Sequence, residues 1–470
     1  MPPTQERIMD NVTLVLPTDE GWDAARQAWN LAVDQNPAAV ALPETAEQVA
    51  QAVRYARERG LRVVPQSTGH TASPLGDLSN TLLVKTERLR TVEIDPEARI
   101  ARAGGGALWM DVTQAAAPHG LAALAGSSPD VGVAGYHLGG GISWLARKYG
   151  LATNNLTAVE LVDAEGRIVR ADADNEPDLF WAIRGGGGSF GVVTALEFRL
   201  FPVPEVYAGA LFFPADRLRE VLHAWREWTE SVPDEVMSVG RFMQFPPIPD
   251  VPEPLRGRSF AIVEATYIGT EDDGAELLRP LRELRPLMDT FATIPVQTLD
   301  KLHMDPEHPV PGIGDGMLLS DLPAEAIDDL TGLLGRGSSL LSVEVRHLGG
   351  ELANARPENG VFASVEAGFA MFAVGIPMTP EIATAVHSEI DYVQETLRRY
   401  DAGRMYMNFA EKPRTGKALF GSGYHRLREI KAAYDPEDLF KANHPVPPAR
   451  RSQPRRRPAA QPQRALVDQV

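Results

Sequence analysis

Glycine-rich segments give the clearest sign of chemistry in this chain. They lie around Gly69-His70, at Gly126–Gly141 and at Gly185–Gly191. Glycine loses more backbone entropy on folding than other residues, so such density marks tight turns, close packing or backbone that approaches a ligand. Clustered backbone N–H groups can also bind phosphate. Convergence of the three segments on one extended, phosphate-bearing ligand explains them more economically than three unrelated structural turns.

Side chains arranged for catalysis without a cofactor are not evident. The sequence has no H-E-x-x-H, G-x-S-x-G or G-x-x-x-x-G-K-[ST] motif and no close His/Asp/Glu spacing typical of a metal site. It also lacks cysteine, which excludes disulfides, thiolate metal sites and a cysteine nucleophile. A bound redox cofactor would supply the chemistry that the side chains lack.

One glycine segment matches a dinucleotide-binding pattern only formally. Gly186, Gly188 and Gly191 fit G-x-G-x-x-G. That fingerprint requires a strand before the glycines and a helix after them, so that pyrophosphate meets the N-terminus of the helix. Here the expected helix, Asp178–Ile183, comes first and the expected strand, Val192–Leu200, follows. A Rossmann site is therefore not predicted, which leaves a phosphate-binding nest or a tight helix-to-strand connection.

The elements that must position these segments form an α/β unit up to residue 204. Thr45 is the expected N-cap of a helix whose apolar residues recur at helical spacing until Gly60. The strand Leu61–Pro65 then runs into the Gln66–Ser73 turn, where α/β sheets usually bind ligands. The other expected strands are Thr81–Lys85, Thr91–Ile94, Ile100–Ala103, Thr157–Val162, Arg167–Ala171 and Val192–Leu200, and the other expected helices are Asp111–His119 and Asp178–Ile183.

After residue 204 the pattern changes to long strands interleaved with amphipathic helices. This pattern is typical of an α+β domain, an antiparallel sheet with helices on one face. Pro246–Pro254 and Asp305–Pro311 are expected loops. The expected strands are Val206–Phe213, Ser259–Ile268, Ser338–His347, Val361–Val374 and Arg404–Phe409, and the expected helices are Asp216–Glu230, Asp272–Arg285, Pro380–Tyr400 and Tyr424–Tyr434.

Composition and charge exclude several classes of protein. Of the 470 residues 44% are apolar, enough for large cores, and the formal charge of −17 argues against a nucleic-acid partner. Residues 449–470 differ: six arginines and one aspartate give a local charge of +5 and leave −22 for the preceding residues. This basic tail, rich in Pro, Gln and Ala, is expected to be disordered. Without a membrane-length apolar run or a signal-peptide pattern, a cytoplasmic protein is expected.

Five separated motifs together carry a family resemblance. Three lie in the first half, at Gln66–Thr71, Ser128–Gly141 and Asp178–Gly191, and two near the C-terminus, at Tyr406–Phe409 and Tyr434–Phe440. In this order they resemble the vanillyl-alcohol-oxidase-type flavoproteins, which have a PCMH-type FAD-binding domain. The two C-terminal motifs resemble the berberine-bridge-enzyme-like branch.

The resemblance implies an α+β fold with a two-part FAD-binding domain and a separate α+β substrate-binding domain built on an antiparallel sheet. The chain is expected to return to the FAD-binding domain at its C-terminus. The expected boundaries are residues 1–204 for the FAD-binding domain, 205–400 for the substrate-binding domain, 401–448 for the returning segment and 449–470 for the basic tail.

The cofactor that the resemblance implies is FAD. In this family the histidine of the G-H turn carries the flavin through an 8α-methyl link, and His70 occupies that place. Many relatives add a cysteine tether; Ser128 stands there and cannot form a thioether, so the FAD is expected to be mono-covalent. The expected cofactor-binding residues are His70, Gln66, Ser67, Thr68, Gly69, Thr71, Ser128, Val131, Gly132, Gly135, His137, Gly140, Gly188, Gly191, Val192, Tyr406 and Asn408.

The other histidines considered, His119, His303 and His425, are expected at the surface. Outside this motif, even His70 would be taken as a hydrogen-bonding turn residue.

Tyr406 and Asn408 are also the expected catalytic residues, because the tyrosine of the family's Y-x-N-Y segment lies at the active site. A phenol acts as a base only when nearby positive charge or hydrogen bonds lower its pKa. Phe409 replaces the second tyrosine, so a role for that hydroxyl is absent here. Glu366 is a further catalytic candidate, on the face of an expected strand that carries Phe372; the alternative is a solvent-facing carboxylate.

The expected function is that of an FAD-dependent oxidase that transfers hydride from an alcohol or secondary metabolite to flavin N5, with O₂ as acceptor. Phe369, Met371 and Phe372 favour a tailoring step in natural-product biosynthesis, although such stripes are also typical of cores. The alternatives are an oxygenating flavoenzyme, a sugar or oligosaccharide oxidase, and a flavin-binding protein without turnover. The expected partners are a small-molecule substrate and O₂, with no metal, nucleic acid or membrane, in a monomer or homodimer.

Overall fold

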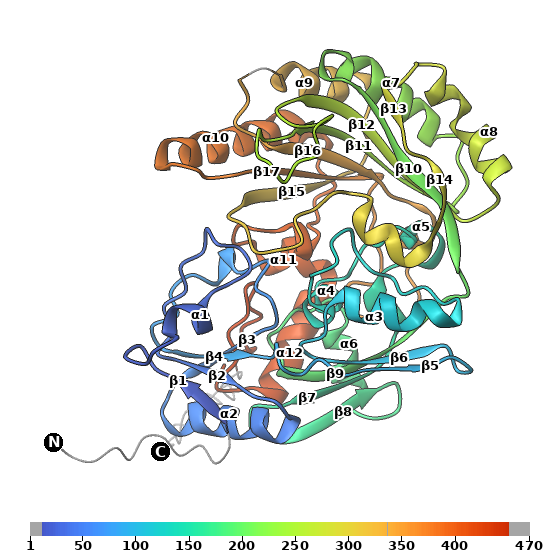
Figure 1. The fold of residues 1–470 in the computed structure, drawn as a ribbon. Coiled ribbons are helices and arrows are strands. Elements are labelled where there is room, and N and C mark those ends of the chain that lie inside the picture. The colour runs from blue at the N-terminus through green and yellow to red at the C-terminus, as the bar shows by residue number, and fades with distance from the viewer. Residues whose placement is uncertain (1–11, 336, 451–470) are drawn as a thin grey trace, which may run out of the picture.

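The computed structural model describes residues 12–335 and 337–450 and divides into two halves (Figure 1). The N-terminal half holds two sheets with strands β1 to β9, and the second half holds one large sheet with strands β10 to β17. The α+β class with an antiparallel sheet is thereby confirmed. Within the described ranges, no helix has both the length and the apolar character needed to cross a bilayer. The basic tail beyond residue 450 lies outside the described residues.

The first sheet places the His70 turn. Its strands, in spatial order, are β1 (Thr13–Val15), β2 (Ala39–Leu42), β4 (Thr81–Lys85) and β3 (Arg62–Gln66), and β2, β4 and β3 run parallel. Helix α2 (Ala46–Glu58) makes the crossover between β2 and β3 that parallel strands require. Its predicted N-cap is confirmed, since the Thr45 side chain accepts a bond from Gln48 N–H. The turn with His70 therefore leaves the carboxyl end of a parallel strand.

The second sheet is antiparallel and shares a core with the first. Its strands, in spatial order, are β5 (Val92–Asp95), β6 (Ile100–Gly104), β9 (Val192–Arg199), β7 (Leu156–Val162) and β8 (Ile168–Asp172). Val53 of α2 packs with Val162 and Val192, which joins the two sheets. Helix α6 (Pro177–Ile183) precedes the Gly185–Gly191 run and β9 follows it, so the order that excluded a Rossmann site is confirmed. The remaining helices here are α1 (Trp22–Arg26), α3 (Trp109–Ala116), α4 (Val133–Leu138) and α5 (Ala146–Tyr149).

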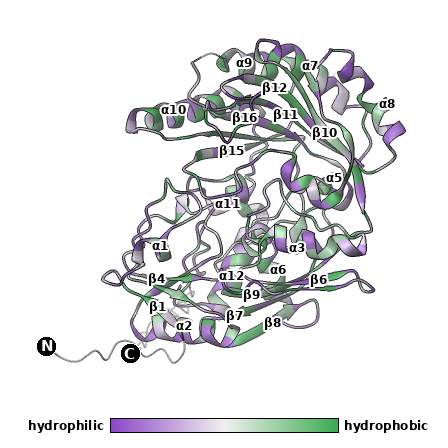
Figure 2. Cartoon of the chain, viewed as in Figure 1, coloured by the Kyte–Doolittle hydropathy of each residue, from purple (hydrophilic) through white to green (hydrophobic). Residues whose placement is uncertain are grey.

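The third sheet has helices on one face only. Its strands, in spatial order, are β13 (Met288–Asp289), β10 (Glu205–Pro214), β12 (Ser259–Tyr267), β11 (Val236–Gln244), β16 (Ser342–His347), β17 (Phe369–Gly375) and β15 (Ile313–Leu319), and β14 (Ala292–Pro295) also pairs with β10. The covering helices are α7 (Leu218–Thr229), α8 (Glu271–Arg282), α9 (Ala324–Leu333) and α10 (Pro380–Leu397) (Figure 1). Figure 2 shows hydrophobic and hydrophilic residues alternating along α7, which buries Val221 and Trp225. The other face of the sheet is turned toward the N-terminal half.

The C-terminal segment returns to the N-terminal half through α11 (Gly416–Phe420) and α12 (Tyr424–Tyr434) (Figure 1). Phe440 forms a β-bridge with Val63 of β3. Lys431 is fully buried and donates to the Ser189 carbonyl at 2.7 Å and to the Asp435 carboxylate at 2.6 Å. We propose domain boundaries near residues 204, 400 and 448, because β10 begins at residue 205 and the last helical turn of the third sheet's cover ends at residue 400.

Three expected strands differ from the structure. Residues 361–368 are irregular, and only Phe369–Gly375 form β17, because the N–H groups of Val361 and Phe362 donate to carbonyls of the N-terminal half. The segment expected at Arg404–Phe409 contains a 3₁₀ turn. The strand expected from Ser338 begins at Ser342 as β16, since Ser338 and Ser339 bond to Glu389 instead.

Six strands of the described chain were missed by sequence patterning: the short strands β1, β2, β13 and β14, and the longer strands β11 and β15. Gly240 and Arg241 interrupt the apolar run of β11, and Gly314 and Gly316 interrupt that of β15. Gly314 has a packing role: a Cβ there would lie 2.5 Å from the ring of Phe372 on the neighbouring strand.

Candidate active site

A cavity of about 930 Å³ is lined by residues of both halves. All three glycine-rich segments contribute to its wall, as do β11, β16 and β17 of the third sheet and the segment Tyr406–Phe409. Its volume is in the range of ligand and cofactor sites. The predicted convergence of the glycine segments on one site is therefore observed.

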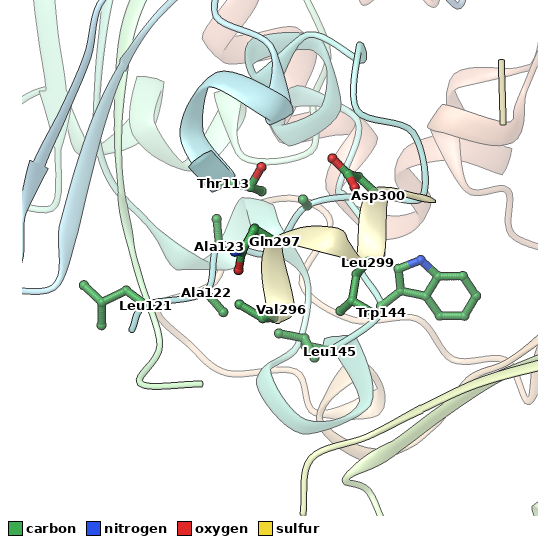
Figure 3. A pocket seen from close by; sticks show the side chains of 12 residues that line it. Thr113, Leu121, Ala122, Ala123, Trp144, Leu145, Val296, Gln297, Leu299 and Asp300 are labelled. Carbon is green, nitrogen blue, oxygen red and sulfur yellow. The ribbon is translucent and has the colours of Figure 1, made fainter. Parts of the chain in front are cut away.

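A second pocket lies beside α3 and is unsuited to a substrate (Figure 3). Figure 3 shows Leu121, Val296 and Leu299 around it, with Asp300 at one side. Its volume of about 20 Å³ leaves room for about one water molecule.

His70 stands on the cavity wall in a defined orientation. Its ring stacks on Trp29, with centroids 4.0 Å apart and planes 17° apart. Nδ1 lies 2.8 Å from Thr68 Oγ1. Nε2 lies 3.5 Å from Asp130 Oδ1 and is buried without a hydrogen bond. An unsatisfied buried nitrogen at a cavity is the arrangement expected of an atom that contacts a ligand.

A carboxylate that sequence reasoning missed stands beside His70. Asp130 Oδ1 accepts a hydrogen bond from Ser128 Oγ at 2.9 Å, and Asp130 Oδ2 accepts one from Trp29 Nε1. Burial works against its ionisation, but His70, Trp29 and Ser128 together hold the pKa of Asp130 below its usual value. The available signal was a carboxylate two residues after Ser128, the position at which the family resemblance implies a cysteine in many relatives. Trp29 is distant in sequence and gave no signal.

The segments around His70 fit FAD in this structure. Gln66 Nε2 and Ser67 Oγ are buried donors that form no hydrogen bond within the described part of the chain. A Cβ added to Gly135, which also lines the cavity, would meet no atom within 4 Å, so the backbone there opens onto free space. Unpaired donors and bare backbone along a cavity suit the phosphates and polar ring edge of a flavin nucleotide. The predicted cofactor residues that line the cavity are Gln66, Ser67, Thr68, Gly69, His70, Thr71, Ser128, Val131, Gly132, Gly135, Gly188, Gly191, Tyr406 and Asn408.

The prediction for His137 is corrected by the structure. Its Nδ1 is bonded to the Val133 carbonyl at 2.9 Å, and its ring packs 4.8 Å from that of Phe198. Burial lowers the pKa of His137 to about 4, so the ring is neutral. It is a buried residue of α4 and does not line the cavity.

Gly140 and Val192 are corrected for reasons of backbone geometry. Gly140 has a φ of 117°, a backbone conformation that favours glycine, and it lies against the rings of Phe362 and Tyr406. Its role is therefore to allow the turn that follows α4. On β9 the side chains alternate, and Val193 lines the cavity while Val192 is buried in the core on the other side.

Tyr406 and Asn408 meet at the cavity as predicted. The phenol oxygen of Tyr406 accepts bonds from Ile142 N–H at 2.9 Å and from Asn408 Nδ2 at 3.1 Å. Burial raises the pKa of Tyr406 to about 12, against the opposing effects of these two donors and of the Arg346 charge. The oxygen of Tyr406 already accepts two N–H bonds. Its own O–H group is therefore free to donate a hydrogen bond to a further group in the cavity.

The third sheet supplies the opposite wall through one face. Arg241, Glu344 and Phe372 lie abreast on β11, β16 and β17, and all three line the cavity. Because side chains alternate along a strand, the residues next to these three in sequence, such as Met371, point toward the covering helices. Phe369 and Met371, expected in the pocket, are therefore core residues, and Phe372 alone of that stripe lines the cavity.

Two further sequence predictions are corrected on this side. His303 was expected at the surface but is 3% exposed and bonded to Glu264 and Glu344. Glu366, the third catalytic candidate, is exposed, lies in the irregular segment before β17 and does not line the cavity. His119 and His425 are exposed as expected.

Family models match two parts of the chain. One described as an FAD binding domain matches residues 37–172, and one described as berberine and berberine like matches residues 405–447. The first range contains the His70 turn and the Gly126–Gly141 segment, and the second contains Tyr406 and Asn408.

Known proteins resemble the chain over different lengths. It is 27% identical over 455 residues to the uncharacterized FAD-linked oxidoreductase YvdP of Bacillus subtilis (strain 168), a match that covers 92% of this chain and 97% of that protein. It is 37% identical over 192 residues to the (R)-6-hydroxynicotine oxidase of Paenarthrobacter nicotinovorans, which covers 41% of this chain and 42% of that protein.

Solved structures share the whole fold. Physcomitrella patens BBE-like 1 matches with a TM-score of 0.82 at 24% identity, over 94% of this chain and 98% of that one. The 6-hydroxy-D-nicotine oxidase of Arthrobacter nicotinovorans matches with a TM-score of 0.78 at 26% identity, over 92% and 96%.

Proposed function

We propose that this chain, which the matches identify as an FAD-linked oxidoreductase of the berberine-bridge-enzyme-like type, is an oxidase that takes hydride from an alcohol or secondary metabolite and delivers the electrons to O₂. One observation carries the proposal: a single cavity joins the glycine segments and His70 to Tyr406 and to one face of the third sheet. Cofactor-holding and substrate-holding groups thus share one space.

FAD would be held along the His70 turn and the two longer glycine segments. When bound, it supplies the hydride acceptor and the route to O₂. We propose covalent attachment through His70 alone, because Ser128 cannot form a thioether. Nε2 is the candidate atom, since Thr68 engages Nδ1 while Nε2 is buried and forms no hydrogen bond to a described residue, with Asp130 Oδ1 3.5 Å away.

Tyr406 is the proposed proton acceptor for the substrate hydroxyl. In its phenolate form, the oxygen would keep the bonds from Ile142 N–H and Asn408 and would gain from the positive charge of Arg346. Asn408 also bonds to the Tyr136 carbonyl at 3.0 Å, which fixes its amide and so the position of the phenol. Phe409, which stands where the family has a second tyrosine, packs edge-on against Tyr406 and brings no hydroxyl of its own.

The attachment is tested by denaturing the purified protein and following flavin fluorescence on a denaturing gel. We expect fluorescence that migrates with the wild-type polypeptide and is absent from His70→Ala. His308→Ala is the matched control, since His308 is an exposed histidine at the same cavity and should keep the link. Flavin that leaves the wild type on denaturation refutes the covalent link, and a colourless protein refutes FAD binding.

The oxidase activity is tested separately by mixing the flavin-containing protein with a panel of alcohols. Anaerobic bleaching of the flavin, followed by H₂O₂ release when air is admitted, is the expected result. Oxidised flavin that persists with every alcohol would favour an oxygenating flavoenzyme or a flavin-binding protein without turnover. Rapid bleaching with oligosaccharides alone would favour a sugar oxidase.

A tailoring role in natural-product biosynthesis and a cytoplasmic location complete the proposal. The apolar share of the cavity wall, with Met243, Phe245 and Phe372, supports a substrate with an apolar body over a sugar.

A further inference from the structure

The cavity wall on the third sheet contains a buried cluster of five charged side chains. The exposed fractions are 0% for Glu264, 3% for His303, 4% for Glu344, 5% for Arg241 and 9% for Arg346. Burial and Arg241 oppose protonation of His303, but Glu264 and Glu344 raise its pKa to about 9. At neutral pH these five side chains are three cations and two carboxylates, and the nearby Asp305 carboxylate also favours the charged forms of His303 and Arg346.

Arg241 and His303 have their partners within the protein. Arg241 Nε donates to Ser342 Oγ at 2.8 Å, and its terminal nitrogens donate to the His303 carbonyl, Glu264 and Met243. The two ring nitrogens of His303 bind Glu264 and Glu344. These cations are satisfied, and a ligand would have to displace existing bonds to reach them.

Arg346 differs, because only one of its donors is engaged. Its Nε donates to Glu344 Oε1 at 2.7 Å, while its two terminal nitrogens form no hydrogen bond to any described residue. Arg346 lines the cavity and is more than nine-tenths buried. Asp305, another carboxylate at the cavity, accepts a bond from Ser127 at 2.8 Å and forms no ion pair with Arg346 in the described chain. Neither terminal nitrogen is among the fully buried unpaired atoms of the described chain, so both can be reached from the cavity, where a charged donor pair binds an anion strongly.

We propose that Arg346 binds a carboxylate of the substrate, so that the substrate is an apolar or aromatic molecule that carries a carboxylate group. This inference rests on the proposed function and names its substrate class. A guanidinium fixed at Nε presents its terminal donors in the planar arrangement that suits a carboxylate. Glu344, itself held by His303, is the positioning residue that fixes the fork.

The surroundings of Arg346 place this carboxylate near the reacting end. The Arg346 guanidinium lies 5.0 Å from the ring centroid of Phe409. Phe409 in turn lies 5.1 Å from the ring of Tyr406 and 4.8 Å from that of Phe372. A substrate whose apolar part packs against Phe372 and Phe409 therefore lies within reach of both the Arg346 guanidinium and the Tyr406 phenol.

Calorimetric titration of the purified flavin-containing protein with benzoate and with benzamide tests the proposal, because the two probes match in shape and differ in charge. We expect benzoate to bind about tenfold to a hundredfold more tightly than benzamide, the range for a hydrogen-bonded charged pair. Arg346→Gln should remove this preference, and Arg346→Lys, which keeps the charge without the fork, should retain part of it. Lys301→Gln, which removes an exposed cation lining the same cavity, should leave the preference intact.

Several results would overturn the assignment. One is equal affinity of the wild type for benzoate and benzamide. A second is that no carboxylate binds, whether benzoate or the two further probes phenylacetate and octanoate. A third is unchanged benzoate affinity in well-folded Arg346→Gln or Arg346→Lys. A shifted flavin absorption spectrum in Arg346→Gln with unchanged benzoate affinity would assign Arg346 to the cofactor. Binding involves no turnover, so failure of the oxidase proposal would appear separately, as benzoate binding without H₂O₂ release from any alcohol.

Discussion

At the residue scale, the site depends on the proton of Tyr406. The phenol is 2% exposed, and burial disfavours its charged form more strongly than the two N–H donors and Arg346 favour it. At neutral pH the phenol is therefore protonated and only a small fraction is phenolate. As pH rises toward the pKa of about 12, the phenolate fraction grows.

This balance predicts a rate that increases with pH. If Tyr406 accepts the hydroxyl proton, flavin reduction by an alcohol should accelerate about tenfold per pH unit between about pH 7 and 10, because only the phenolate is active. Tyr406→Phe should slow the reduction by roughly 10²- to 10⁴-fold and remove this slope. Anaerobic stopped-flow absorbance measures both.

The matched control is Tyr149→Phe, a half-buried tyrosine that stacks on Phe201 outside the cavity. It should keep the wild-type rate and slope. A rate that is independent of pH in the wild type would contradict the assignment of Tyr406 as the proton acceptor.

At the element scale, glycines of similar sequence context serve two different purposes. Gly106, after β6, allows close packing: a Cβ there would lie 1.8 Å from the Thr86 carbonyl oxygen. Gly135, in α4, is not restricted by any neighbour within 4 Å and lines the cavity. The first glycine is required by the fold, and the second leaves space for the ligand.

Two alanine substitutions separate these purposes. Gly106→Ala should lower the unfolding midpoint strongly, since an added methyl in a packed interior costs about 1–3 kcal/mol even without a backbone clash. Gly135→Ala should keep the midpoint of the flavin-free protein or raise it, by up to about 1 kcal/mol of helix propensity, but lower the flavin bound per protein. Thermal unfolding and the ratio of flavin to protein absorbance give the two readouts.

Gly332→Ala in α9 controls for the helix effect, because its Cβ would also meet nothing within 4 Å and it does not line the cavity. It should leave the flavin content unchanged. Full flavin content in Gly135→Ala would show that this glycine does not border the cofactor.

At the scale of the whole molecule, the active-site cavity is assembled from parts distant in sequence. The N-terminal half contributes His70, the half with the third sheet contributes Phe372 and Arg346, and the returning segment contributes Tyr406. That segment continues into α12, where buried Lys431 bonds to the Ser189 carbonyl beside the last glycine run. The cavity therefore depends on how the segment from Tyr406 through α12 is held against the N-terminal half.

Lys431→Met tests this attachment. The substitution leaves Asp435 buried without its cation, and breaking a buried ion pair in this way typically costs about 3–5 kcal/mol. It also removes the hydrogen bond to the Ser189 carbonyl of the glycine run. We expect a lower urea midpoint together with earlier flavin release. Lys417→Met, at an exposed lysine of α11, should behave as the wild type. Wild-type stability in Lys431→Met would show that the ion pair does not hold the C-terminal segment.

Local patterns allowed much of the fold to be predicted. Amphipathic spacing and the Thr45 cap identified α2, and the Tyr424–Tyr434 helix has the predicted bounds. Prediction failed where backbone groups have partners distant in sequence. Residues 361–368 read as strand by composition, yet the N–H groups of Val361 and Phe362 bond to the other half of the molecule.

By itself, the sequence determined that the chain has glycine-rich segments around a histidine turn, no thiol and a Tyr-x-Asn segment, and hence which residues could hold and use a flavin. Only the tertiary structure decided which of them share a space, because alternation and packing place Val193 at the cavity and Val192 in the core. It alone also brought Trp29 and Asp130 to His70 and left the terminal donors of Arg346 without a hydrogen bond to any described residue. The physical reason is that helix spacing and caps depend on neighbours within a few residues, whereas burial and the pairing of charges depend on contacts between distant segments.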